Sequence, residues 1–267
     1  MFSKFRILIN DGNTFNIDNY YESGLRHLSS HKSTLTAKLD QFIDYKTGLI
    51  DGEKLEKEWF KEIRADIFLS HSHADEKLAI ALAGWLSTEM GLNAFVDSCV
   101  WGFANDLLDK INNRFNLLKT EADGSKTYSH NKANYAASHI YLMLNSALNN
   151  MINKTESFMF INTDNSTIYM DKNKASAYTL SPWIYSEVVM ANTMRITTPV
   201  RPIRIEKRAE LYHMMNESMN ITHKLDFSDF VDINLSCFRT WKISKKSGEH
   251  ALDALYRITG EETSIYG

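Results

Sequence analysis

The chain has 267 residues, and its composition already excludes several classes of protein. Hydrophobic residues make up 43% and charged residues 24%, which is ordinary for a folded soluble chain and excludes a wholly disordered one. The net charge of −3 provides no general surface for nucleic acid, and two cysteines without a C-x-x-C pair fit a reducing cytosol. No apolar run approaches the roughly 20 residues of a membrane span. We therefore expect a cytoplasmic protein without nucleic-acid or membrane partners.

The pattern of the sequence changes at residue 65. Residues 1–64 are polar and predict a mostly helical N-terminal extension. Beyond them, short apolar runs that predict strands alternate with segments of helical periodicity. Strands are predicted at 65–70, 93–97, 158–162, 200–205 and 230–233. Helices are predicted at 76–90, 106–117, 135–153, 181–194, 206–220 and 249–258.

Such alternation indicates an α/β fold, a doubly wound parallel sheet with helices on both faces. We expect this domain to span residues 65–267, with an inserted helix and loop at about 104–134. Ligands of such sheets bind outside the carboxyl ends of the strands. The functional edge is therefore predicted to hold residues 70–75, 97–101, 162–164 and the start of the helix at 181.

The first segment with chemical potential is His71-Ser72-His73-Ala74-Asp75. Its H-x-H-x-D spacing is similar to the metal-binding start of the metallo-β-lactamase fold, which needs imidazoles and a carboxylate around a metal. Glu76 stands where that motif has a further histidine, and a helix follows in place of glycines. A loop in which Ser72 or Asp75 caps the helix, and a loop that lines a substrate, are the alternatives. We favour the substrate-lining loop and expect no metal.

The second segment is Ser181-Pro182-Trp183, followed by Glu187. Serine at the N-cap and proline at the first helical position predict the start of a helix. Trp183 and Glu187 are four residues apart and therefore share one helical face. Alone, this pattern also fits an aromatic anchor beside a surface glutamate.

Taken together, three segments resemble a TIR domain in order and spacing. They are DIFLSHSHADEKLAIALAGWL with GLNAFVD, then FMFINTDN, then SPWIYSEV. The resemblance covers about residues 65–260, interrupted near 104–134, and leaves residues 1–64 outside. The overall pattern is similar to bacterial stand-alone TIR proteins, including the TIR subunit of Thoeris anti-phage systems. This resemblance implies a flavodoxin-like doubly wound sheet.

The resemblance also implies roles for particular residues. Glu187 matches the glutamate that is catalytic in enzymatic TIR domains, where NAD⁺ is cleaved at the nicotinamide–ribose bond. Trp183 would pack against the ribose or orient that glutamate. The other expected substrate-binding residues lie in two loops of the family's sheet. The loop after the first strand lines the nucleotide pocket and corresponds to Ser70, His71 and Ser72. The loop after the second strand covers the substrate, takes part in assembly and corresponds to Asp97, Ser98 and Trp101.

The function that follows is an NAD⁺ nucleosidase or ADP-ribosyl cyclase, with NAD⁺ as substrate and no further cofactor. Its partners would be other TIR domains and an effector that responds to the nucleotide product in anti-phage defence. The alternatives are a non-catalytic TIR scaffold that acts by homotypic assembly, an enzyme similar to nucleoside deoxyribosyltransferases, and a metallohydrolase. The product, the trigger and the oligomeric state stay open at this stage. The extension and the insertion are expected to serve assembly, lid closure or sensing.

Overall fold

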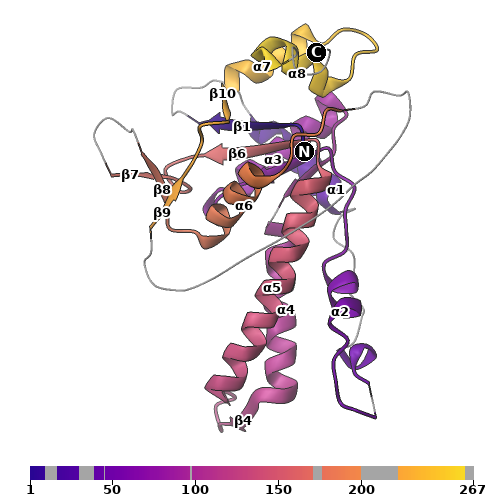
Figure 1. Ribbon diagram of the computed structural model, residues 1–267, viewed down its shortest axis with the longest axis vertical. Coiled ribbons are helices and arrows are strands. Elements are labelled where there is room, and N and C mark those ends of the chain that lie inside the picture. Colours follow the sequence, from indigo (N-terminus) through magenta and orange to yellow (C-terminus); the bar gives the residue numbers. More distant parts are fainter. Residues whose placement is uncertain are drawn as a thin grey trace.

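The computed structural model describes residues 1–9, 17–29, 39–44, 46–96, 98–170, 176–199 and 222–261, with only the backbone described for 98–103. Its centre is a sheet of five parallel strands in the order β10-β1-β6-β2-β3 (Figure 1). In chain order these strands are β1 Ser3–Leu8, β2 Ile67–Ser70, β3 Ala94–Val96, β6 Ser157–Asn162 and β10 Val231–Asn234.

Helices cover both faces of this sheet. They are α1 Tyr21–Ser29, α2 Gly52–Trp59, α3 Glu76–Trp85, α4 Ser98–Ile111, α5 His130–Lys154, α6 Pro182–Thr193, α7 Leu235–Ser244 and α8 Ala251–Thr259. Short helical turns add η1 Ile17–Tyr20, η2 Leu39–Phe42, η3 His73–Asp75, η4 Leu86–Met90 and η5 Asn112–Asn116. The predicted α/β doubly wound architecture is therefore present. In the described parts of the chain, no helix has the length and apolar character needed to cross a membrane.

Two apolar cores separate the helices into layers. Successive side chains of a strand point to opposite faces of the sheet, so each buried strand supplies both cores. In β2, Ile67 and Leu69 pack with α1, α3, α7 and α8, whereas Phe68 packs with α2, α4, α5 and α6. In β6, Met159 and Phe160 divide between the same two layers. A side chain's position within its strand thus decides which helices it meets.

The N-terminal residues differ from the predicted helical extension, because residues 3–8 are a central strand of the sheet. Phe5 and Ile7 are fully buried on one face of β1. The charges that interrupt the apolar run, Lys4 and Arg6, lie on the other face and have partners there. Arg6 donates to both carboxylate oxygens of Asp232 on β10, at 2.7 and 2.5 Å. Charges that suggest an exposed segment in the sequence are thus accommodated by ion pairs within the sheet.

The order of strands has one consequence for the expected flavodoxin-like topology. If β2 is taken as the first strand of a flavodoxin-like sheet, the neighbour of β6 on the side away from β2 should be a strand that comes later in the chain. In the described residues that neighbour of β6 is β1, from the start of the chain. The strand predicted at 200–205 and the helix predicted at 206–220 lie outside the described residues.

The predicted insertion at about 104–134 comprises the second half of α4, the hairpin after it and the first turn of α5, which are part of a two-helix arm. The helices α4 and α5 run side by side away from the sheet (Figure 1). At the far end they are joined by a hairpin of β4 Leu117–Thr120 and β5 Lys126–Tyr128. A further antiparallel sheet, in the order β7-β8-β9, consists of Ile168–Tyr169, Ala177–Thr179 and His223–Leu225.

Glu89, in the turn after α3, connects two other elements of the same layer. Tyr20 donates its hydroxyl to Glu89 at 2.7 Å, and Lys242 of α7 forms an ion pair with Glu89 at 2.6 Å. The hydrogen bonds from Lys242 and Tyr20 hold the pKa of the Glu89 carboxyl below its ordinary value. A carboxyl whose pKa is lowered by folding stabilises the protein above its unfolded-state pKa, and this stabilisation is lost as the pH falls through the folded-state pKa.

We therefore expect Glu89→Gln to be less stable than the wild-type protein at pH 7, by up to about 1 kcal/mol, as is usual for a partly exposed pair. The difference should be smaller at pH 3, because the carboxyl of the unfolded wild-type chain is then largely protonated and part of the stabilisation is lost. Urea unfolding of both proteins at the two pH values measures the effect. An equal difference at both values would show that the charge of Glu89 contributes nothing.

Candidate functional site

The carboxyl end of β2 carries the first predicted site residues. From β2 the chain continues to β3, which lies at one end of the sheet. After β6, the next strand of this sheet in the described residues is β10, at the opposite end. In doubly wound sheets, ligands bind in the crevice outside the carboxyl ends of the strands at such a divergence, which here corresponds to the ends of β2 and β6. Ser70 ends β2 and is fully buried, and His71 follows it with 3% exposure. Since Ser70 is two residues after Phe68, it faces the layer that contains α6.

Glu187 reaches the same edge from α6. The helix begins as its sequence predicts: the Ser181 hydroxyl accepts a hydrogen bond from the backbone N–H of Ile184 at 3.3 Å, and Pro182 occupies the first turn. Glu187 is 1% exposed, and its Oε2 accepts a hydrogen bond from Ser70 Oγ at 2.6 Å. Two residues separated by 117 positions in the sequence are thus in direct contact. This contact joins two of the segments on which the TIR resemblance depends.

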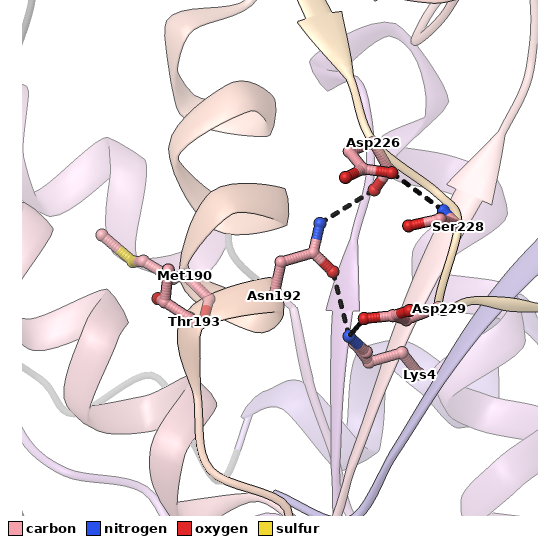
Figure 2. Close-up of polar contacts among 7 residues, drawn as sticks. All are labelled: Lys4, Met190, Asn192, Thr193, Asp226, Ser228 and Asp229. Carbon is pink, nitrogen blue, oxygen red and sulfur yellow. Dashed lines mark hydrogen bonds and ion pairs between the residues drawn. The ribbon is translucent and has the colours of Figure 1, made fainter.

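The far end of α6 is held by polar contacts to the sheet (Figure 2). Asn192 donates to the backbone carbonyl of Asp226 at 2.8 Å and accepts from Lys4 Nζ of β1 at 3.0 Å. Lys4 also pairs with Asp229 at 3.4 Å, in the loop between β9 and β10. These contacts fix the C-terminal end of α6 against β1 and the loop between β9 and β10, and so restrict the position of Glu187.

Trp183 lies on α6 and is half-buried. The rings of Trp183 and of Tyr141 on α5 pack in an edge-to-face arrangement, with their centroids 5.9 Å apart. One turn further, Ser186 donates to Asn145 of α5 at 2.8 Å. Trp183 therefore contributes to packing between α6 and α5, as expected of an aromatic anchor, in the same helix as Glu187.

A second polar network lies at this edge, around residues 75 and 163, which the sequence places at the edge without assigning them a binding role. Asp75 is 8% exposed and accepts from Thr163 Oγ1 at 2.5 Å and from Asn165 Nδ2 at 2.7 Å. It joins the segment after β2 to the loop after β6, across the crevice. The alternative of a helix cap is wrong, because neither Ser72 nor Asp75 makes a side-chain cap hydrogen bond. The signal in the sequence was the polar run after β6, which suggests hydrogen-bonding partners but not which ones.

Replacing Asp75 by asparagine is expected to destabilise the protein by about 1–3 kcal/mol, because an amide cannot accept both charge-assisted hydrogen bonds without leaving a donor unpaired. Thermal and urea unfolding measure this loss. The matched control is Asp164→Asn, in the same loop but exposed, which should change stability by less than about 0.5 kcal/mol. Equal effects of the two substitutions would contradict a structural role for Asp75.

The three residues of the H-x-H-x-D segment do not converge on one point. His71 is buried, whereas the His73 side chain is 82% exposed and lies 3.5 Å from Glu76. The Asp75 oxygens are engaged by Thr163 and Asn165. Within the described ranges, these side chains are not a group that could hold a metal ion. The arrangement does not support a metallo-β-lactamase-like centre at this segment.

The remaining predicted residues follow β3. Asp97 lies outside the described residues. The prediction of a loop after this strand is wrong for Ser98 and Trp101, because α4 begins at Ser98. The helix α4 therefore starts about two turns earlier than the predicted bound near residue 106.

No family model, curated protein or solved structure matches this chain. The chemical potential of the site therefore has to be argued from its geometry. A carboxylate that accepts a hydroxyl hydrogen bond, at the carboxyl edge of a doubly wound sheet, is suited to stabilising positive charge that develops on a bound ligand.

Proposed function

We propose that this chain is a TIR-type enzyme that cleaves NAD⁺ between nicotinamide and ribose, with Glu187 as its catalytic residue. The observation that carries the proposal is the contact between Ser70 and Glu187 at the crevice between β2 and β6. The resemblance to TIR domains places the nucleotide-lining loop and the catalytic glutamate at these two positions, and the fold brings them together. The proposed nucleotide site also includes His71, Ser72 and Trp183, with Asp97, Ser98 and Trp101 assigned by the motif alone.

The proposed chemistry needs one carboxylate. Nicotinamide leaves NAD⁺ as a neutral base from a cationic precursor, so its departure requires no general acid. The ribose then resembles an oxocarbenium ion, as in glycoside hydrolysis. The Glu187 carboxylate stabilises this positive charge, and the Ser70 hydroxyl orients the carboxylate through its hydrogen bond. Water at the ribosyl carbon then yields ADP-ribose, whereas a nucleophile within the nucleotide yields a cyclic product.

The burial of Glu187 has a further consequence for activity. Because this side chain is 1% exposed, substrate reaches the carboxylate only after neighbouring residues move. We expect the resting protein to be weakly active, and self-association through TIR domains to favour the open site. In the cytoplasm this arrangement would couple an infection signal to the release of an ADP-ribose-derived messenger that a partner effector binds.

The test is the mass analysis of products formed from NAD⁺ by the full chain and by Glu187→Gln, in dilute, concentrated and infected-cell samples. Release of nicotinamide together with linear, cyclic or conjugated ADP-ribose, lost in the variant, is the expected result. A non-catalytic scaffold would self-associate and leave NAD⁺ intact under all three conditions. An enzyme similar to nucleoside deoxyribosyltransferases would exchange nucleobases between deoxynucleosides and leave NAD⁺ intact. Either outcome would overturn the proposal.

A further inference from the structure

A second cluster of chemically capable side chains lies at the opposite edge of the sheet from Glu187. Glu156 directly precedes β6, whereas His250 and Asp253 belong to the start of α8. Each offers one ligand atom, and these atoms all lie within 4.8 Å of one another. Among the described residues this is the one group of three such side chains. The proposed NAD⁺ chemistry makes no use of it.

The fold holds Glu156 in place from several directions. Its backbone N–H donates to the carbonyl of Asp66 at 3.0 Å, and its carbonyl accepts from the N–H of Phe2 at 2.6 Å. The hydroxyl of Tyr256 on α8 donates to Glu156 Oε1 at 2.9 Å. A hydrogen-bonded carboxylate of this kind is typical of metal ligands, because an outer partner orients the oxygen that binds the ion.

His250 provides the independent observation. It occupies the N-cap position of α8, where serine, threonine, aspartate or asparagine would normally bond the free backbone N–H groups. Its side chain makes no cap hydrogen bond, and its Nδ1 is buried with no hydrogen-bond partner in the described structure. A buried ring nitrogen without a partner costs free energy, and a ligand at this nitrogen removes that cost. The three-residue spacing puts Asp253 on the same side of the first turn.

We propose that Glu156, His250 and Asp253 bind a divalent transition-metal ion of the zinc class. One imidazole and two carboxylates are a donor set that suits zinc, which is bound at about 2.0–2.2 Å and leaves a fourth position for water. The three ligand atoms lie within 4.8 Å of one another and come from the start of α8 and from the residue before β6, so one ion could contact all three. The ion would therefore act as a cross-link between the C-terminal helices and the sheet.

The local charges favour a cation. The two carboxylates carry more negative charge than the roughly half-unit of positive charge that a helix N-terminus contributes. The amino group of Met1 donates a hydrogen bond to the backbone carbonyl of Asn153 at 3.3 Å. Arg257 is directed to Glu249, at 3.0 and 3.1 Å, and to the carbonyl of Ser244. Two of the three side chains of the cluster are carboxylates, the residue type that favours a cation.

The experiment is a calorimetric titration of the EDTA-treated, desalted full chain with zinc chloride, with thermal unfolding measured with and without zinc. We expect one equivalent of Zn²⁺ to bind and to raise the unfolding temperature, because an ion that binds only the folded state stabilises it. Mg²⁺ should bind much more weakly, since an imidazole ligand disfavours it. In His250→Gln, zinc affinity should fall at least about 10-fold, the loss seen even for outer partners of metal ligands.

Two further variants keep the result decisive. Asp253→Asn should lower the affinity similarly, and it settles the question if His250→Gln fails to fold. His73→Gln is the matched control, because His73 also lies beside a carboxylate, Glu76, but within a pair. Retention of zinc binding in both cluster variants, loss of binding in His73→Gln, or no binding to the wild-type chain would overturn the proposal. Each of these outcomes is independent of NAD⁺ turnover.

Discussion

Replacing Glu187 by glutamine is expected to lower the rate of NAD⁺ cleavage by at least about 100-fold, the loss typical of removing one preorganised group that stabilises transition-state charge. Glutamine has nearly the same shape and its amide oxygen can still accept the hydrogen bond from Ser70, which is 2.6 Å from the carboxylate in the wild-type protein. It has no negative charge to offer the ribosyl cation. The loss should therefore appear in kcat, with little change in KM. Initial rates of nicotinamide release over a range of NAD⁺ concentrations measure both.

The matched control for this prediction is Glu76→Gln. Glu76 begins α3 just after the same loop, but its side chain is 41% exposed and lies beside His73. It should retain activity within about twofold. A comparable loss in both variants would assign the effect to the overall negative charge of the edge, and full activity of Glu187→Gln would remove Glu187 from the mechanism.

Gly84→Ala is expected to produce the largest loss of stability, about 3 kcal/mol or more, at the upper end of what overpacking costs. Gly84 lies on α3 where α1 and the preceding turn η1 cross it. A Cβ at this position would lie 2.1 Å from the carbonyl oxygen of Tyr20 and 2.5 Å from the backbone nitrogen of Gly24. Both are backbone atoms, so only separation of the helices can relieve the clash. Because a domain is stable by only about 5–15 kcal/mol, urea unfolding should show a clearly lowered midpoint.

Gly52→Ala is the control for this substitution. Gly52 is the first residue of α2, and a Cβ there would meet Met143 Cε at 3.3 Å, the end of a flexible side chain. Alanine also favours helix more than glycine does. Stability of this variant should therefore stay within about 1 kcal/mol of wild type. Equal losses at the two positions would show that the close crossing of α1 and α3 does not limit stability.

Local signals were sufficient for most elements between residues 65 and 162. The short apolar runs that predict β2, β3 and β6 are three to six consecutive buried residues in the structure, as expected for strands covered on both faces. The start of α6 was also predictable, since Ser181 and Pro182 act through bonds within one turn. The strand β1 was not, because the partners of its alternating charges come from β10, from the loop before β10 and from α6, all far away in the sequence.

Part of the candidate site could be found in the sequence, namely Ser70 and Glu187 as members of separate motifs. Their contact could not be, because it depends on the strand order that brings α6 over the end of β2. Asp75 is a clearer case. Its position before a helix predicts an N-cap, whereas in the tertiary structure its two carboxylate oxygens accept hydrogen bonds from Thr163 and Asn165 in the loop after β6. The cluster of Glu156, His250 and Asp253 has no spacing in the sequence that indicates a common site.

The sequence by itself therefore determined the alternation of strands and helices, the helix that carries Glu187 and the two-sided burial of the sheet. These depend on periodicity and capping, which act within a few residues. Only the tertiary structure decided that β1 stands between β6 and β10, and which polar residues meet at each edge of the sheet. The reason is that strand order and side-chain pairing depend on contacts between residues more than one hundred positions apart, such as Ser70 with Glu187.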